Sequence, residues 1–140
     1  MGRAMDPEDD IYETVTRSLA VRVRPSYLVE QSDPDQRRWV WAYVVEIENL
    51  GEETVQLISR HWIITDAWGR VEEVKGQGVV GEQPTLKPGE RYEYASGCPL
   101  STSSGSMSGS YQMVTDDGET FDIAIPAFSL DTPSASRTFN

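Results

Sequence analysis

Hydrophobic and polar residues alternate along much of the chain, and the clearest case is the segment Arg38–Leu50. Its odd positions from Trp39 to Ile47 are all apolar, whereas its even positions change from apolar residues in the first half to Glu46 and Glu48 in the second. A period of two places successive side chains on opposite faces of a β-strand. The segment is therefore predicted to be a strand with one face buried throughout and the other covered only along its first half.

A similar alternation predicts one half-buried strand at Val15–Arg24, where only Ala20 interrupts the polar positions. Pro25 follows it, and a proline cannot donate a hydrogen bond to a neighbouring strand. Pro25 is therefore predicted to mark a sheet edge, a bulge or the end of the strand.

Further strands are predicted between turn signals in the rest of the chain. These strands are Thr54–Thr65, Val71–Val74, Arg91–Tyr94, Ser110–Thr115 and Thr120–Ile125. The turns contain Gly, Pro and Asp, which favour turn conformations, and are Asp66–Gly69, Lys87–Glu90 and Asp116–Gly118. The polar stretch Ser101–Ser110 is predicted to be a loop, either a mobile binding loop or a plain connection. The chain is expected to become irregular from Pro126 onward.

This pattern of about seven to eight short strands separated by turns is typical of an all-β, immunoglobulin-like antiparallel sandwich. We expect a single sandwich domain over residues 14–130. Residues 1–13 are predicted to be an acidic tail, and residues 131–140 a second tail.

Composition and charge narrow the possible partners. The 140 residues include 23 acidic and 12 basic side chains, which gives a formal charge of −11. Such a chain repels phosphate backbones, so neither nucleic acid nor an anionic membrane is an expected partner. The chain has no apolar run of the length of a membrane helix and no apolar secretory signal, so a cytoplasmic location is expected.

The motif Gly76-Gln77-Gly78-Val79-Val80-Gly81 fits the G-x-G-x-x-G pattern of dinucleotide-binding proteins. In those proteins a helix follows the glycines and its N-terminus receives the pyrophosphate. Here Glu82-Gln83-Pro84 and then a Pro-Gly turn follow, so no helix is expected. The favoured interpretation is a loop whose glycines adopt positive φ or allow close packing. The alternative is a loop whose N–H groups, with Lys75 beside them, hold an anion.

No set of catalytic residues can be named from the sequence, so an enzyme is not expected and no cofactor is implied. The single histidine, His61, lies inside a predicted strand, and Cys98 is the single cysteine. The two could form a base and a nucleophile, but a hydrogen-bonded histidine and a small buried thiol are favoured. The acidic clusters Asp6–Asp10, Glu72-Glu73 and Asp116–Glu119 have no EF-hand spacing, so no dedicated metal site is predicted.

Several strings together resemble the bacterial ApaG family, over roughly residues 19–130. They are Ser59–Asp66, Gly76–Pro84, Leu86–Glu90, Tyr94–Leu100, Met107–Met113 and Ile125–Phe128. The chain departs from the family pattern at Trp68, where relatives tend to have a small polar residue, and at Ser103, where proline is common. The resemblance implies a fibronectin type III-like β-sandwich, a role in protein–protein contact, and a link to cobalt resistance and magnesium efflux. It identifies no catalytic residue.

Three functions follow as hypotheses. The first is a non-enzymatic interaction module that contacts an unidentified protein partner, with Trp68 as the candidate contact at a hairpin tip. The second is a module that binds a phosphate, a pyrophosphate or a nucleotide at Lys75, Gly76, Gly78 and Gly81, helped by Arg60 or Arg91. The third is a divalent-cation function. A homodimer formed through edge strands is possible in any of them.

Overall fold

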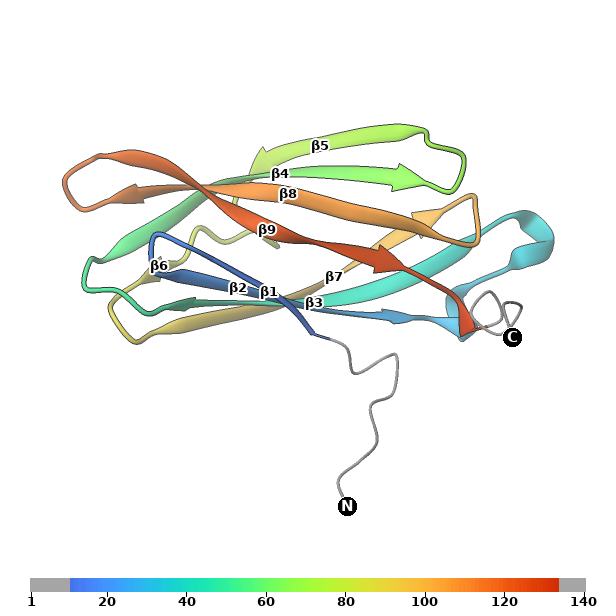
Figure 1. Cartoon of the computed structure of the whole chain (residues 1–140), viewed down its shortest axis with the longest axis horizontal. Coiled ribbons are helices and arrows are strands. Elements are labelled where there is room, and N and C mark those ends of the chain that lie inside the picture. The colour runs from blue at the N-terminus through green and yellow to red at the C-terminus, as the bar shows by residue number, and fades with distance from the viewer. Residues whose placement is uncertain (1–10, 134–140) are drawn as a thin grey trace, which may run out of the picture.

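The computed structural model describes residues 11–133, which form two antiparallel sheets packed face to face (Figure 1). The first sheet contains, in spatial order, β1 (Tyr12–Thr16), β2 (Leu19–Tyr27), β3 (Trp39–Asn49) and β7 (Arg91–Leu100). The second contains, in spatial order, β5 (Val71–Gln77), β4 (Val55–Asp66), β8 (Gly105–Thr115) and β9 (Thr120–Leu130), with β6 (Thr85–Leu86) beside β4. Two short 3-10 turns, η2 (Val29–Gln31) and η3 (Pro34–Gln36), connect β2 to β3. The prediction of an all-β antiparallel sandwich is confirmed. Within residues 11–133 no helix has the length and apolar character needed to cross a membrane.

The burial of β3 follows the alternation in its sequence. Trp41, Tyr43, Val45 and Ile47 are buried, whereas Glu46 and its even neighbours are only half-buried. The strand pairs with β2 on one side and with β7 on the other, so it is central in the first sheet. The predicted strand at Arg38–Leu50 is therefore confirmed to within one residue at each end.

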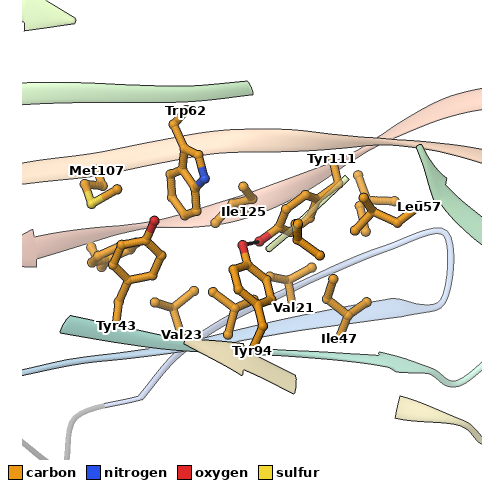
Figure 2. Packing of buried hydrophobic residues seen from close by; sticks show 14 of the residues in the cluster. Val21, Val23, Tyr43, Ile47, Leu57, Trp62, Tyr94, Met107, Tyr111 and Ile125 are labelled. Carbon is orange, nitrogen blue, oxygen red and sulfur yellow. Dashed lines mark hydrogen bonds between the residues drawn. The ribbon is translucent and has the colours of Figure 1, made fainter. Parts of the chain in front are cut away.

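Aromatic residues from both sheets form the middle of the core (Figure 2). Trp62 of β4 is 3% exposed, and its ring lies 5.2 Å from Tyr43 and 6.0 Å from Phe128, between ring centroids. The hydroxyl groups of Tyr94 and Tyr111 lie 2.5 Å apart and satisfy each other within this apolar region. Burial raises the pKa of both phenols, so both stay protonated and each can act as donor or acceptor.

The first predicted strand is in fact a hairpin. β1 and β2 pair antiparallel across a turn at Arg17 and Ser18, and the prediction of one strand over Val15–Arg24 was wrong. Both turn residues have a left-handed backbone, with φ of 49° and 63°. This two-residue turn usually contains Asn and Gly, so Arg-Ser gives no turn signal in the sequence.

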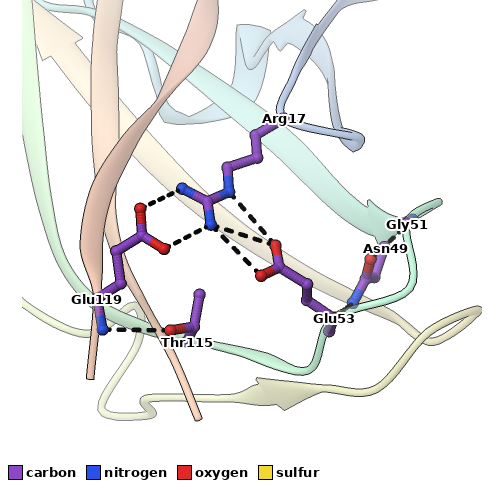
Figure 3. Close-up of polar contacts among 6 residues, drawn as sticks. All are labelled: Arg17, Asn49, Gly51, Glu53, Thr115 and Glu119. Carbon is purple, nitrogen blue, oxygen red and sulfur yellow. Dashed lines mark hydrogen bonds and ion pairs between the residues drawn. The ribbon is translucent and has the colours of Figure 1, made fainter. Parts of the chain in front are cut away.

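Arg17 offsets the unfavourable turn conformation by joining two hairpin turns and the turn that connects the two sheets (Figure 3). Its guanidinium donates to the carboxylate of Glu119 at 2.8 and 2.9 Å, and to that of Glu53 at 3.3 Å. Beside it, the buried Asn49 side chain donates to the backbone oxygens of Glu53 and Leu86 and accepts from the N–H of Gly51. The β1–β2, β3–β4 and β8–β9 turns are therefore tied together at this end of the sandwich.

Several boundaries differ from those expected from the sequence. β8 begins at Gly105, so only the first residues of Ser101–Ser110 form a loop. β9 continues through Pro126 to Leu130, because a bulge opposite Ser108 accommodates the proline. β1 includes Tyr12 and Glu13, and the Trp41 indole donates to the backbone oxygen of Asp131 at 2.8 Å. The described structure therefore extends into both stretches assigned to tails, while residues 1–10 and 134–140 lie outside the described residues.

Stability in acid should depend on the half-buried ion pair between Arg22 and Glu46, whose atoms Nη1 and Oε1 lie 2.8 Å apart. The hydrogen bond from Arg22 lowers the pKa of Glu46 below its ordinary value of 4.5, burial opposes this effect, and Arg91 adds to it. A carboxyl group whose pKa is lowered by folding contributes stability above its ordinary pKa, and this contribution is lost as the pH falls through the lowered value.

We therefore expect Glu46→Gln to be less stable than the wild type above about pH 5, with the difference shrinking below about pH 4. Urea unfolding measured across this range provides the test, with the exposed Glu52→Gln as the control. A difference that does not change with pH would contradict the assignment.

Candidate functional site

The turn between β4 and β5 presents the most exposed aromatic ring among residues 11–133. Trp68 is 63% exposed at the tip of this hairpin. Gly69 adopts a φ of 83°, and its N–H donates to the backbone oxygen of Asp66 at 3.0 Å. The hairpin predicted at Asp66–Gly69 is confirmed.

The carboxylate of Asp66 fixes the backbone of this turn. One oxygen accepts from the N–H groups of Trp68 and Arg70 at 2.9 and 3.0 Å, and the other accepts from the Arg70 guanidinium at 3.1 Å. Desolvation opposes ionisation of Asp66, but these hydrogen bonds and the charge of Arg70 together lower its pKa. Asp66 is therefore an anion that holds the turn in a single shape.

The ring of Trp68 is held from one side by Arg70, whose guanidinium carbon lies 4.7 Å from the ring centroid. A cation over an aromatic face is attracted by the negative face of the ring.

The turn also contacts the β7–β8 loop, because the N–H of Ala67 donates to the hydroxyl of Thr102 at 3.1 Å. Thr102 is buried and donates to the backbone oxygen of Ser104, so it anchors the loop as well as the turn. The predicted contact residue is thus exposed and rigidly presented.

The glycine motif forms a tight turn. Val79 and Glu82 exchange two backbone hydrogen bonds, of 2.8 and 2.9 Å, and the N–H of Gly78 donates to the oxygen of Ile58. Gly78 and Gly81 have positive φ values of 65° and 82°. The next element is β6, so no helix begins at the motif, as the sequence predicted. The N–H groups of Gly78, Val79 and Glu82 therefore already donate to backbone oxygens and are not free to hold an anion in this conformation.

The basic residues considered for an anion site lie in different environments. Lys75 is exposed on β5, whereas Arg91 begins β7 in the other sheet and pairs with Glu46 at 3.2 Å. The Arg60 guanidinium donates to the backbone oxygens of Gln77 and Gly78, and it lies 2.8 Å from where a Cβ of Gly76 would be. Gly76 therefore leaves room for Arg60. An anion site at Lys75, Gly76, Gly78 and Gly81 stays a prediction from the sequence.

His61 and Cys98 are not brought together as a base and a nucleophile. His61 follows Arg60 and precedes the buried Trp62, so it lies on the outer face of its sheet, where Nε2 lies 2.7 Å from the carboxylate of Glu73. Cys98 is 4% exposed on β7 in the other sheet, and burial raises the pKa of its thiol to about 11. Such a thiol is protonated and unreactive near neutral pH.

The acidic clusters do not assemble a metal site in the part of the chain that the structure describes. No group of three or more His, Cys, Asp or Glu side chains is arranged there to hold a metal ion. The cluster Asp6–Asp10 lies outside the described residues.

Sequence reasoning identified Trp68 and missed the residues that hold it. Asp66 carried a usable signal, because Asp two residues before the tip of a turn commonly accepts backbone hydrogen bonds. Thr102 carried none, since its role depends on two loops that are far apart in the sequence.

These features define a class of protein: an acidic β-sandwich domain with a rigid aromatic hairpin tip. The model of the ApaG domain matches residues 29–115. Similar chains include the ApaG protein of Xanthobacter autotrophicus, with 60% identity over 93% of this chain and 100% of that protein, and the ApaG protein of Caulobacter vibrioides, with 56% identity over all of both chains. A crystal structure described as that of an ApaA protein from Bordetella pertussis is similar, with a TM-score of 0.81 and 50% identity over 91% of this chain and 98% of that one.

The chain belongs to the ApaG family.

Proposed function

We propose that this ApaG chain is a non-enzymatic module that contacts a protein partner through the Trp68 turn. The observation that carries the proposal is the combination of high exposure and fixed backbone at Trp68. Tryptophan and arginine are enriched among the few interface residues that contribute most of the binding free energy. Because the turn is already ordered, binding would lose little conformational entropy.

Two further points support a contact role. The separation of His61 from the buried, protonated Cys98 favours binding over catalysis. The resemblance to domains that serve protein–protein contact points the same way. Because relatives tend to have a small polar residue at this position, the Trp68 contact would be particular to this chain. The link of the family to cobalt resistance and magnesium efflux leads us to expect a partner that acts on divalent-cation transport.

The proposal predicts that Trp68→Ala weakens capture of a specific partner from lysate by about 30-fold or more, as removal of a central tryptophan typically costs at least about 2 kcal/mol. Leu50→Ala is the matched control, since Leu50 is 55% exposed and lies before the β3–β4 turn at the opposite end of the sandwich. Quantitative mass spectrometry of the captured proteins gives the readout. Equal capture by the wild type and both variants would contradict a role for Trp68.

A further inference from the structure

Apart from the two-residue strand β6, four strands lie at the sheet edges, and they differ in how they are protected against pairing with another chain. Edge strands expose unpaired N–H and C=O groups, and proteins commonly cover them or place proline there. β1 and β9 lie against each other, and the N–H of Ala124 in β9 donates to the hydroxyl of Thr16 in β1. β7 carries Pro99. β5 contains no proline, and no strand among residues 11–133 pairs with its outer side. Figure 1 shows it at the margin of the molecule.

The register of β5 identifies the backbone groups that point outward. In an antiparallel pair, opposite residues alternate between hydrogen-bonded and non-hydrogen-bonded pairs. The N–H of Asp66 donates to Arg70, and that of Gly78 donates to Ile58, so the even residues of β5 are bonded to β4. The N–H and C=O groups of its odd residues therefore face away from the sheet: Val71, Glu73, Lys75 and Gln77. These groups can form a complete antiparallel ladder with a second strand of the same length.

We propose that β5 pairs antiparallel with β5 of a second copy of this chain, about a two-fold axis at Val74. This register places Glu73 of each copy directly opposite Lys75 of the other, and it pairs all seven residues of the strand. Opposite charges directly across an antiparallel pair are favourable. The registers centred on Glu73 or on Lys75 would instead place two identical charges opposite each other, so the charges select one register.

The even residues of β5 support the same register on the inner face. Glu72 of one copy lies opposite Gly76 of the other, and the Arg60 guanidinium lies against Gly76. Among residues 11–133, Arg60 donates through Nη1 to the backbone oxygens of Gln77 and Gly78, which leaves Nε and Nη2 to donate to a carboxylate of the second copy. On the outer face Glu73, whose carboxylate also lies 2.7 Å from Nε2 of His61, therefore meets Lys75 of the other copy, and on the inner face Glu72 meets Arg60 of the other copy.

The dimer joins the second sheets of two copies into one continuous sheet. An interface of one short strand from each copy is small, so we expect a concentration-dependent equilibrium and not a permanent dimer. The charge of −11 on each copy opposes association at low ionic strength, and physiological salt screens this repulsion. The paired residues end at Val71, so the dimer does not require Trp68 and is independent of the partner contact proposed above.

Sedimentation equilibrium at about 150 mM salt tests the proposal over loading concentrations from about 1 μM to about 1 mM. The weight-average mass of the wild type should rise above 15.7 kDa towards twice that value. Lys75→Glu creates two Glu–Glu pairs in the dimer and should weaken dimerisation at least about tenfold. Lys87→Glu makes the same charge change in an exposed turn outside β5 and should dimerise like the wild type.

A charge exchange provides the decisive comparison. Glu73→Lys alone places lysines opposite each other, and Lys75→Glu alone places glutamates opposite each other, so each variant by itself should dimerise at least about tenfold more weakly than the wild type. An equimolar mixture of the two should form a heterodimer at the concentrations at which the wild type dimerises, because each pair then has opposite charges again. Circular dichroism checks that both variants fold.

Amide hydrogen exchange gives an independent measurement in the wild type. The N–H groups of Glu73 and Lys75 should exchange at least about tenfold more slowly at high protein concentration than at low concentration. The N–H of Val74 donates to β4 in either state and should be protected at both concentrations. A wild type that stays monomeric at the highest concentration, or a mixture of variants that stays monomeric while the wild type dimerises, would overturn the proposal.

Discussion

Replacing Trp62 with alanine should lower the free energy of unfolding by about 3–5 kcal/mol, a large fraction of the about 5–15 kcal/mol typical of a domain. Trp62 is 3% exposed and packs edge-on against Tyr43, Phe128 and Tyr111, which come from both sheets (Figure 2). Removing the indole leaves a cavity between the two sheets that these rigid rings cannot fill. Urea unfolding followed by circular dichroism measures the effect.

The chain contains its own control for this experiment. Trp68→Ala is the same chemical change at a position that is 63% exposed, so we expect it to cost less than about 1 kcal/mol, chiefly the lost contact with Arg70. The two tryptophans should therefore separate stability from binding: Trp62 maintains the fold, and Trp68 makes the contact. Equal destabilisation by the two substitutions would mean that Trp62 is not the centre of the core.

Gly78→Ala should destabilise the protein by about 3 kcal/mol or more, well beyond the effect of Gly81→Ala at about 1–2 kcal/mol. Both glycines have positive φ, which costs any other L-residue free energy. At Gly78 a Cβ would also lie 2.4 Å from the backbone oxygen of Glu82, so the turn itself would have to move. At Gly81 nothing lies within 4 Å of a Cβ.

Thermal and urea unfolding of the two variants, without any anion present, tests this difference. If the motif exists mainly to form the Val79–Glu82 turn, Gly78→Ala is the more damaging change in buffer alone. Two variants with the stability of the wild type would mean that the glycines are kept for another purpose, such as the predicted anion site.

The sandwich could be predicted because its strands carry an alternation that is strong and local. In β3, every odd position from Trp39 to Ile47 is apolar, and the turns at Asp66–Gly69 and Lys87–Glu90 contain the residues that their backbone needs. The β1–β2 turn was missed because Arg17 and Ser18 are rarely found in a left-handed turn. The turn is stabilised by Glu53 and Glu119, which are distant in sequence and therefore invisible to a local pattern.

The expectation for Pro126 was wrong and the one for Pro25 was correct. Both outcomes depend on whether the position of the missing N–H faces a neighbouring strand. Pro126 was expected to end regular structure, but it lies on an edge strand at a bulge, where a missing N–H removes no ladder hydrogen bond. Pro25 was expected at an edge, a bulge or a strand end, and it lies beyond the part of β2 that pairs with β1. The sequence cannot distinguish these cases, because they depend on which side of a strand has a neighbour.

The exposure of Trp68 could be predicted from the sequence, but the fixed backbone of its turn could not. Trp68 in a turn signal is visible in the sequence, whereas the anion of Asp66, the stacking of Arg70 and the hydrogen bond to Thr102 depend on the folded backbone. Because those contacts give the proposed interface its pre-ordered shape, loss of any of them should weaken binding less than loss of the ring itself.

Photo-crosslinking in living cells tests the contact role of the Trp68 turn most directly. A photoreactive phenylalanine placed at Ala67, beside Trp68, is compared with one at Leu50, both of which are exposed. We expect a defined adduct with one protein from the Ala67 position alone, and its loss when Trp68→Ala is added to the same chain. A set of adducts shared by both positions, or an adduct at Ala67 that persists without the tryptophan, would contradict the contact role of Trp68.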